Sequence, residues 1–395
     1  MKEAWRWFGP HDPVLLDHVR QAGATDIVSA LHHLKPGEVW TDAAVADRKN
    51  VIETTPPGRK PLTWSIVESI PIPDDVKRLG KSAKHSIESW IASLEAVAKA
   101  DIKTICYNFM PVVDWTRTDL DFELPTGATC LRFDQDRFAA FDLFILQRPD
   151  AERDYDAESM ARAKLKYERF TDEDIASLVH VIASALPGST TEPLTIDGFR
   201  ERLMLYRGID AARLRQHLID FLEAVTPTAE SLGVKLTLHP DDPPRSLFGL
   251  PRIASTEADY AALFNAVPSE ANGMCFCTGS LGVRPDNDLV AIANRFAERI
   301  HFVHLRATKR DQDQPLSFIE ADHLDGDVDM VTVFEALIRE DRKRMKYKKI
   351  PFRPDHGHRM LDDISKTITP GYAGIGRLKG LAELRGVMRA VEKLS

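Results

Sequence analysis

The sequence has few cysteines, no excess of positive charge and no long apolar run, and each absence argues against a class of protein. Four cysteines in 395 residues, Cys106, Cys130, Cys275 and Cys277, are too few for a disulfide framework and indicate a reducing compartment. The net charge of −8 argues against binding to nucleic acid or to an anionic membrane through a basic face. No apolar run reaches the ~18 residues that span a bilayer, and the N-terminus lacks the apolar core of a secretory signal. We therefore expect a cytoplasmic protein that binds neither nucleic acid nor membranes.

What the sequence does contain is a regular alternation of strand-like and helix-like segments. Runs of strand length lie near 3–8, 26–31, 62–68, 102–108, 234–239, 273–277, 300–305 and 350–353. Helical patterns lie between and after them, near 13–22, 42–54, 83–99, 210–232, 257–266, 286–298, 328–344 and 375–392. We expect Thr41 and Asp329 to cap two of these helices and Pro13 to lie in the first turn of another. Eight such units predict an α/β fold, a TIM (β/α)8 barrel in which residues 1–395 form a single domain.

Residues 115–205 interrupt this alternation, because they show no clear strand–helix repeat. They contain charged segments with a helical pattern at 151–170 and 172–186. We predict a helical insertion in the loop after the fourth strand, of the kind that covers an active site or makes subunit contacts. Its helices look too polar to build a core of their own, so we expect no second independent domain.

Four apolar runs in the second half of the chain end on side chains that bind metals. These side chains are His239, Cys277, His304 and Asp355. A single histidine at a strand end is more often structural, but a barrel brings the C-terminal ends of its strands to one mouth, where the four could share one divalent ion. Thiolate and imidazole favour a transition metal over Mg²⁺ or Ca²⁺, and the carboxylate is compatible with manganese and iron. Cys275 faces the same way as Cys277 but lies deeper, so we expect it to have a packing role.

Other polar side chains follow the strands and are candidates for binding and proton transfer. Arg306 lies two residues after His304 and should point into the mouth, where an arginine most often orients a carboxylate or phosphate. His323 and Tyr372 lie on polar loops after late strands, and both can carry a proton. For each, the alternative is a capping or supporting role. Candidates for substrate contact at other strand ends are Trp7, Glu68, Asn108 and His358.

Longer motifs run through essentially the whole chain, and together they are specific. Examples are Trp5-Arg-Trp-Phe-Gly9, Cys106-Tyr-Asn-Phe-Met-Pro111, His239-Pro-Asp-Asp-Pro-Pro244, Cys277-Thr-Gly-Ser280 and Arg353-Pro-Asp-His-Gly-His358. In these motifs the sequence resembles the D-mannonate dehydratases of bacterial hexuronate catabolism. The resemblance implies a xylose-isomerase-like barrel and dehydration of D-mannonate to 2-dehydro-3-deoxy-D-gluconate. It also implies a divalent metal, Mn²⁺ or Fe²⁺, on the same four residues: His239, Cys277, His304 and Asp355.

The implied reaction removes the C2 proton of an aldonate and expels its C3 hydroxyl group, so it needs a base and an acid. Tyr372 and His323 are the candidates, with Arg306 as the clamp for the substrate carboxylate. The main alternative is a metal-dependent sugar isomerase on the same barrel, although such enzymes usually hold the metal through several carboxylates. A DNA-repair nuclease is disfavoured by the acidic net charge. We expect a small aldonate as substrate and a homo-oligomer as the assembled form.

Overall fold

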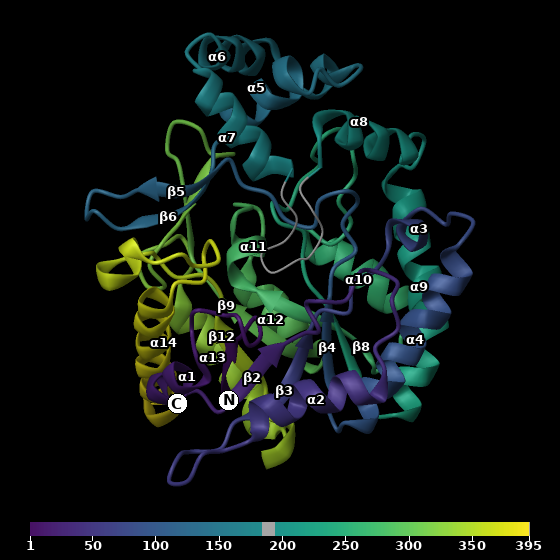
Figure 1. The fold of residues 1–395 in the computed structure, drawn as a ribbon, viewed down its shortest axis with the longest axis vertical. Coiled ribbons are helices and arrows are strands. Elements are labelled where there is room, and N and C mark those ends of the chain that lie inside the picture. The colour runs from purple at the N-terminus through teal and green to yellow at the C-terminus, as the bar shows by residue number, and fades with distance from the viewer. Residues whose placement is uncertain (184–193, 395) are drawn as a thin grey trace.

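Eight parallel strands close into a barrel in the computed structural model, which describes residues 1–183 and 194–394 (Figure 1). The order around the barrel is β1-β12-β9-β8-β7-β4-β3-β2. This closed parallel barrel confirms the predicted fold class. The strands are β1 (Lys2–Arg6), β2 (Asp26–Ser29), β3 (Thr63–Glu68), β4 (Thr104–Tyr107), β7 (Lys235–Leu238), β8 (Asn272–Cys277), β9 (Ile300–Leu305) and β12 (Pro351–Pro354).

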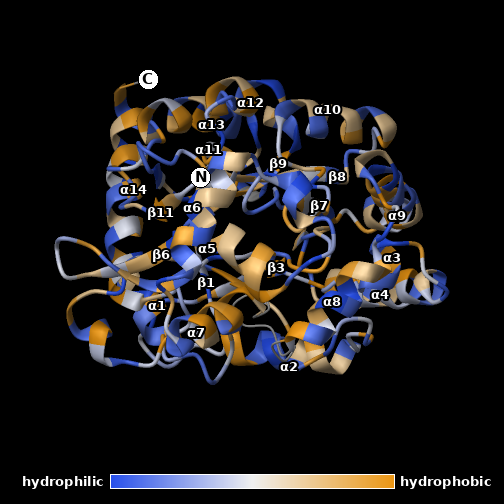
Figure 2. Ribbon diagram, turned by 90° about the horizontal axis from the view of Figure 1, so that it is seen from above, coloured by the Kyte–Doolittle hydropathy of each residue, from blue (hydrophilic) through white to orange (hydrophobic). Residues whose placement is uncertain are grey.

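The helices around the barrel lie where the sequence pattern predicted them. They mix hydrophilic and hydrophobic residues along their length (Figure 2), as is typical of helices that bury one face. None that the structure describes is long and apolar enough to cross a membrane. They are α1 (Leu16–Ala22), α2 (Asp42–Glu53), α4 (Ala83–Lys99), α9 (Ala211–Ser231), α10 (Glu257–Ala266), α12 (Leu289–Arg295), α13 (Met330–Lys343) and α14 (Gly374–Leu394), with a short helix α3 (Asp74–Lys77) before α4.

The predicted caps of α2 and α13 are confirmed, whereas the position predicted for Pro13 is wrong. Thr41 Oγ1 accepts the backbone N–H of Ala44, and the Asp329 carboxylate accepts two N–H groups of the first turn of α13. Pro13 precedes α1, which begins at Leu16. The carboxylate of Asp12 accepts the N–H groups of Phe8 and Val14, and these bonds hold the chain in a turn around Pro13.

The barrel interior is built in layers, and one apolar layer lies directly beneath the mouth. It consists of Ala4, Val28, Ile66, Cys106, Cys275 and Phe302, each at most 1% exposed. Side chains on a strand alternate between its two faces, so the residue two positions further along points to the same side. For four of these strands that residue is Arg6, Glu68, Cys277 or His304. The next layer therefore carries charged and metal-binding groups, and the packing role predicted for Cys275 agrees with its place in the apolar layer.

The insertion after β4 begins with a β-hairpin, which the sequence pattern did not predict. Strands β5 (Asp119–Glu123) and β6 (Thr129–Phe133) pair antiparallel, and β10 (Thr308–Arg310) and β11 (Phe318–Glu320) extend the sheet in the order β10-β11-β6-β5. The prediction of a purely helical insertion is therefore wrong for this part. The second partner of β6 is β11, which lies in the loop after β9 and is remote in sequence. Pairing between strands so far apart in the chain leaves no signal in the local sequence pattern.

The rest of the described insertion is helical and lies beyond one end of the barrel (Figure 1). The segment predicted at 151–170 contains a 3-10 turn and α6, and the segment predicted at 172–186 is α7 up to Ala183. Residues 184–186 of that prediction lie outside the described residues. The helices are α5 (Gln135–Ala140), which continues as a π-helix over Phe141–Ile145, then α6 (Ala157–Tyr167), α7 (Asp172–Ala183) and α8 (Ile196–Leu205).

The insertion contributes to an apolar cluster, but it does not build this cluster alone. The rings of Phe138, Phe141 and Phe199 lie 4.7–6.2 Å from one another or from Phe248, which follows β7. Other loops of the barrel also contribute to this cluster, including Phe318 of β11. Because barrel loops complete the cluster, the insertion shares its core with the barrel.

We predict that protease cleavage within residues 115–205 will not release a stably folded fragment. A fragment of these residues alone would lose Phe248 and Phe318 from its core, and loss of a buried Phe side chain typically costs ~3–5 kcal/mol. Mass spectrometry of the digest and thermal melting of any fragment would check this. A fragment with a cooperative melt would show that the insertion is a domain in its own right.

Candidate metal and substrate site

The structure brings the four predicted metal ligands together at the barrel mouth. The donor atoms of His239, Cys277 and His304 all lie within 4.8 Å of one another. Oδ2 of Asp355 lies 3.9 Å from Cys277 Sγ and 3.9 Å from His304 Nδ1. The residues come from the ends of β7, β8, β9 and β12, which are neighbours in the barrel. Four consecutive strand ends therefore present one thiol, two imidazoles and one carboxylate to a common point.

The chemistry of this donor set fits a divalent transition metal. Neither ring nitrogen of His304 makes a hydrogen bond of good geometry within the described residues, although the ring is 1% exposed. Buried polar atoms normally have a partner, and a cation would supply one. Nδ1 of His239 lies 2.7 Å from the carbonyl oxygen of Pro240, which can hold the proton there and leave the lone pair on Nε2. Thiolate, imidazole and carboxylate together suit manganese, iron or zinc.

Cys277 is held in place by the short helix α11 (Thr278–Gly282), for which it is the N-terminal cap. The backbone N–H of Ser280 donates to Cys277 Sγ over 3.4 Å, and the Ser280 hydroxyl lies 3.3 Å from the same sulfur. The Cys277-Thr-Gly-Ser280 motif therefore fixes the direction of the sulfur toward the mouth.

A cavity of about 50 Å³ lies against these ligands at the mouth of the barrel. Three of the predicted residues, Glu68, Asn108 and Tyr372, line it beside His239 and Asp355. Trp115 lines it too, which places the start of the insertion over the site as predicted. The complete lining is Arg6, Glu68, Ser69, Asn108, Asp114, Trp115, His239, Asp242, Arg353, Asp355, His356 and Tyr372.

Trp7, a predicted substrate contact, is not in this lining, and the alternation of strand side chains explains why. Ala4 points into the barrel, so Arg6 does as well, while Trp7 points the other way and packs in the core with the Arg48 guanidinium 5.7 Å from its ring. The strand was expected to reach residue 8 but ends at Arg6. Arg6, which the expected strand end did not indicate, is the residue of β1 that reaches the site.

Two other predicted residues, His323 and His358, lie behind the site rather than in its lining. His323 is 3% exposed and packs against Gly380 of α14, where an added Cβ would lie 2.2 Å from its ring. Burial lowers the pKa of His323 to about 4, so this ring is neutral at pH 7. His358 Nε2 lies 2.9 Å from the carbonyl oxygen of Glu320, and its Nδ1 lies 3.4 Å from Asp322. Both rings are thus engaged in packing or polar contacts away from the cavity.

Arg306 is occupied by protein carboxylates and does not line the cavity. Its guanidinium donates to Glu320 over 2.6 and 2.7 Å and to Asp242 over 2.6 Å. Arg117, from the insertion, donates to the same two carboxylates over 2.8–3.1 Å. We call these four residues, Arg117, Asp242, Arg306 and Glu320, the charge quartet. No side chain of the charge quartet is more than 4% exposed.

The charge quartet balances two cations against two anions and ties the insertion to the barrel mouth. Burial alone would raise the pKa of Asp242, but Arg117 and Arg306 lower it to about 2. Burial also opposes ionisation of Glu320, yet Arg306 and His356 hold its pKa well below the usual range. Both carboxylates are therefore ionised at neutral pH, and each depends on both arginines.

We predict that Arg117→Met destabilises the protein strongly. The change leaves two buried carboxylates with one arginine, and breaking a buried ion pair by removing one partner typically costs ~3–5 kcal/mol. The free energy of unfolding from urea denaturation would measure the effect. The matched control is Lys99→Met, which removes the Lys99–Asp42 pair whose side chains are 65% and 63% exposed; exposed pairs contribute ~0–1 kcal/mol. Equal effects of the two substitutions would contradict the role given to the charge quartet.

His356 lines the cavity and was not selected from the sequence, although it lies next to the predicted ligand Asp355. Its Nδ1 is 3.3 Å from Glu320 Oε1, and its Nε2 is 4.0 Å from Asp355 Oδ1. Its ring meets Tyr372 edge-on at 5.2 Å between centroids and Trp115 at 6.3 Å. The motif Asp355-His-Gly-His358 offered two histidines, and only contacts distant in sequence show that His356 is the one at the site.

Arg353 and Arg6 surround Glu68 and were also not selected from the sequence. Arg353 donates to Glu68 over 2.9 Å and to Asp355 over 2.5 Å, and Arg6 forms an ion pair with Glu68. Although burial opposes ionisation, Arg353 and its neighbours hold the pKa values of Glu68 and Asp355 well below their usual range. Arg353 lies two residues before Asp355, so the alternation along β12 was the signal that could have identified it.

Tyr372 lines the cavity with a buried phenol ring. Burial, together with the charge of Asp355, raises its pKa to about 12, against the opposing effect of Arg353 and Arg6. Its ring packs edge-on against Phe8 with centroids 4.8 Å apart. The phenol is therefore protonated across the neutral range and can donate a proton.

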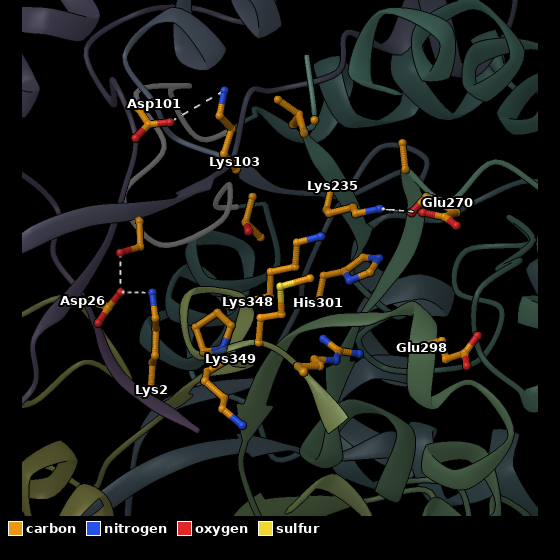
Figure 3. Close-up of a pocket in the computed structure, with 18 of the residues that line it drawn as sticks. Lys2, Asp26, Asp101, Lys103, Lys235, Glu270, Glu298, His301, Lys348 and Lys349 are labelled. Atoms are coloured by element: carbon orange, nitrogen blue, oxygen red, sulfur yellow. Dashed lines mark hydrogen bonds and ion pairs between the residues drawn. The ribbon is translucent and has the colours of Figure 1, made fainter. Parts of the chain in front are cut away.

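A larger cavity, of about 1040 Å³, lies at the opposite end of the strands (Figure 3). Several lysines line it, but each of three has an acidic partner: Lys2 with Asp26 at 3.6 Å, Lys103 with Asp101 at 3.8 Å, and Lys235 with Glu270 at 3.6 Å. Lys348 and Lys349, from the basic run after α13, also face it. Active sites of such barrels lie at the C-terminal ends of the strands, so this cavity has no part in the chemistry at the mouth.

Comparison with known proteins agrees with this geometry. The family model described as D-mannonate dehydratase (UxuA) matches residues 1–395. A mannonate dehydratase of Brucella canis is 67% identical over 392 residues, which are 99% of this chain and 98% of that protein. The crystal structure of mannonate dehydratase from Streptococcus suis serotype 2 has a TM-score of 0.76 and 30% identity, and the match covers 100% of this chain and 94% of that one. A xylose isomerase-like TIM barrel protein from Mycobacterium smegmatis shares the fold alone, with a TM-score of 0.51 and 12% identity over 98% of this chain and 97% of that one.

Proposed function

Because the chain belongs to the D-mannonate dehydratase family, we propose that the residues at its barrel mouth dehydrate D-mannonate to 2-dehydro-3-deoxy-D-gluconate. The enzyme is a metal-dependent hydro-lyase. The observation that supports the proposal for the site is the convergence of four donors from adjacent strands beside a cavity lined by His356 and Tyr372. The following assignments of residues to steps rest on that geometry.

We propose that His239, Cys277, His304 and Asp355 hold one Mn²⁺ or Fe²⁺ ion. When bound, a divalent ion supplies positive charge that stabilises negative charge developing on the substrate. The pKa of Asp355, held well below its usual range, keeps this carboxylate ionised and ready to bind a cation. A transition metal fits the thiolate and imidazole ligands better than Mg²⁺ does.

We predict that Cys277→Ser weakens binding of Zn²⁺ and Fe²⁺ more than binding of Mn²⁺, because the thiolate is the soft ligand of the set. Isothermal titration of the metal-free protein with each ion would measure this selectivity. Cys130→Ser is the matched control, since Cys130 is also buried but lies on β6 of the insertion sheet. Equal weakening of all three metals would argue against Cys277 as a ligand.

His356 is the proposed base that removes the C2 proton. The ionised Glu320 carboxylate lies 3.3 Å from Nδ1, and its negative charge favours the tautomer with the proton on Nδ1 and the lone pair on Nε2. Nε2 is the ring nitrogen on the side of Asp355, where the substrate would meet the metal ligands. Glu320 is thus a positioning residue that selects the useful tautomer.

Tyr372 is the proposed acid that protonates the departing C3 hydroxyl group. Its phenol is neutral at pH 7 because its pKa is about 12, so it has a proton to give. With C2–H removed by His356 and the C3–O bond broken, water leaves and an enol remains. The enol then becomes the 2-keto acid by taking up a proton at C3 and losing the proton of its C2 hydroxyl group, which requires no redox cofactor.

Arg6 is the proposed clamp for the substrate carboxylate, in place of Arg306. Arg6 lines the cavity, and its buried Nε has no hydrogen-bond partner within the described residues. The Arg306 guanidinium is less available to a substrate carboxylate, since both of its edges donate to Glu320 and Asp242. Arginine binds carboxylates through paired N–H donors, which also orients the substrate.

Incubation of the metal-loaded protein with D-mannonate would test the proposed function, with formation of the 2-keto acid as the readout. The expected product lacks the C3 hydroxyl group. Formation of a ketose with all hydroxyl groups retained would instead support the sugar isomerase alternative. That alternative has less support, because the donor set has one carboxylate rather than several.

We also propose that the protein acts as a homo-oligomer in the cytoplasm. This proposal rests on the few cysteines and on the expectation that the insertion after β4 makes subunit contacts. Light scattering of the purified protein would give the number of chains in the particle. A monomer at physiological concentration would contradict the proposal.

A further inference from the structure

A second set of metal-binding side chains lies one layer below the mouth. The donor atoms of Cys106, Cys275 and His304 all lie within 4.8 Å of one another. Cys106 is on β4, Cys275 on β8 and His304 on β9, and each is at most 1% exposed. This set shares only His304 with the set at the mouth, so it is a distinct arrangement of donors.

The two thiols face each other inside an otherwise apolar layer of the barrel. The sulfur atoms of Cys106 and Cys275 lie within 4.8 Å of each other. The other members of the layer, Ala4, Val28, Ile66 and Phe302, have no polar side-chain atoms. Two thiols are thus the only side-chain polar groups of this described cluster, and both are directed to the same place.

His304 connects the two layers because its ring stands between them. The ring packs edge-on against Phe302 of the lower layer with centroids 4.7 Å apart, and against His239 of the upper set at 5.0 Å. Its two nitrogens approach different carboxylates, Nδ1 toward Asp355 at 3.9 Å and Nε2 toward Glu68 at 3.4 Å. The same imidazole therefore belongs to both donor sets, so an ion held by one set takes this ligand from the other.

The balance of charge determines which ions would suit the lower set. When a divalent ion replaces the two thiol protons, which pass to solvent, the ion and the two thiolates are neutral together. A neutral unit avoids most of the large cost of placing a net charge in a dry interior. Thiolate and imidazole ligands select soft or borderline ions, and two sulfurs with one nitrogen favour zinc-like d10 ions over Mn²⁺.

We propose that Cys106, Cys275 and His304 form a second cation site, specific for thiophilic d10 ions such as Zn²⁺ and Cd²⁺, and that this site competes with the mouth for His304. A soft ion in the lower site withdraws one of the four ligands from the catalytic set. Mn²⁺ at the mouth holds His304 and opposes binding below. By linkage, each ion weakens the other by the same factor, and coupling of this kind commonly amounts to ~5–150-fold.

A titration of the metal-free protein with Cd²⁺, followed by its thiolate-to-cadmium absorbance in the ultraviolet, would test the proposal. The lower site supplies two thiolates per ion and the mouth supplies one. Cys277→Ser is expected to retain a two-thiolate absorbance, since it leaves the lower site intact. Cys106→Ala and Cys275→Ala are expected to lower the absorbance per bound Cd²⁺ to about half. Cys130→Ser, at a buried cysteine outside both sets, is the matched control and should leave the absorbance unchanged.

The competition has its own readout, which does not depend on turnover. Mn²⁺ bound to the wild-type protein, observed by electron paramagnetic resonance, should be released at lower Cd²⁺ concentration than in Cys106→Ala. Retention of Mn²⁺ binding and of the circular dichroism spectrum would show that the alanine variants are folded. Loss of all thiolate absorbance in Cys277→Ser would overturn the proposal, because Cd²⁺ would then bind only at the mouth. An unchanged absorbance in both Cys106→Ala and Cys275→Ala would overturn it too, whatever the outcome of the D-mannonate assay.

Discussion

Tyr372→Phe is expected to lower turnover of D-mannonate by at least ~10², the usual scale for loss of a general acid or base. The substitution removes only the hydroxyl group, so the edge-on packing of the ring against His356 and Phe8 remains. Because the hydroxyl is no metal ligand, metal content should stay nearly unchanged. Steady-state kinetics and metal analysis of the same preparation would measure both quantities.

Hydrogen exchange at C2 of the substrate would show which proton Tyr372 transfers. If Tyr372 protonates the leaving hydroxyl group, the variant can still remove the C2 proton and return one from solvent. D-Mannonate recovered after incubation in D2O should then carry deuterium at C2, detected by nuclear magnetic resonance. Near-normal turnover of Tyr372→Phe would exclude Tyr372 as the acid. A complete lack of deuterium exchange would indicate that Tyr372 takes part in removal of the C2 proton.

His356→Asn is expected to lower turnover by at least ~10² as well, and to abolish the C2 exchange that Tyr372→Phe retains. The reason is geometric, since His356 lines the cavity and its Nδ1 lies 3.3 Å from the Glu320 carboxylate. His323→Asn is the matched control, because this histidine is also buried but lies away from the cavity, against α14. From the sequence, His323 and Tyr372 are the two candidates for proton transfer. A loss of turnover in His323→Asn as large as in His356→Asn would restore His323 as a candidate.

The barrel and the convergence of the four donor side chains could be predicted from the sequence because both depend on short-range periodicity. Apolar runs of strand length, spaced by helices, identify the strands, and the last residue of each strand identifies the mouth. The same rule, applied one residue too far, selected Trp7 where Arg6 faces inward. An error of one position reverses the direction of a side chain on a strand.

The parts that could not be predicted depend on contacts between distant segments. The strand pair of β6 and β11 joins residues nearly 190 positions apart, and neither strand has a strong pattern of its own. The choice between His356 and His323 depends on which ring meets Glu320 and the cavity, and no local pattern carries that information. Likewise, Arg306 follows the strand-end rule, but two carboxylates from elsewhere in the chain already occupy it.

The charge quartet limits how far this enzyme can be shortened by engineering. A minimal barrel that lacks residues 115–205 would lose Arg117 and keep Arg306, Asp242 and Glu320. The mouth would then hold an excess negative charge close to where an anionic sugar acid must enter. Even if the trimmed barrel folded, it would repel its own substrate. A successful truncation would have to neutralise one of the two carboxylates at the same time, and Asp242 is the better choice, because Glu320 also orients His356.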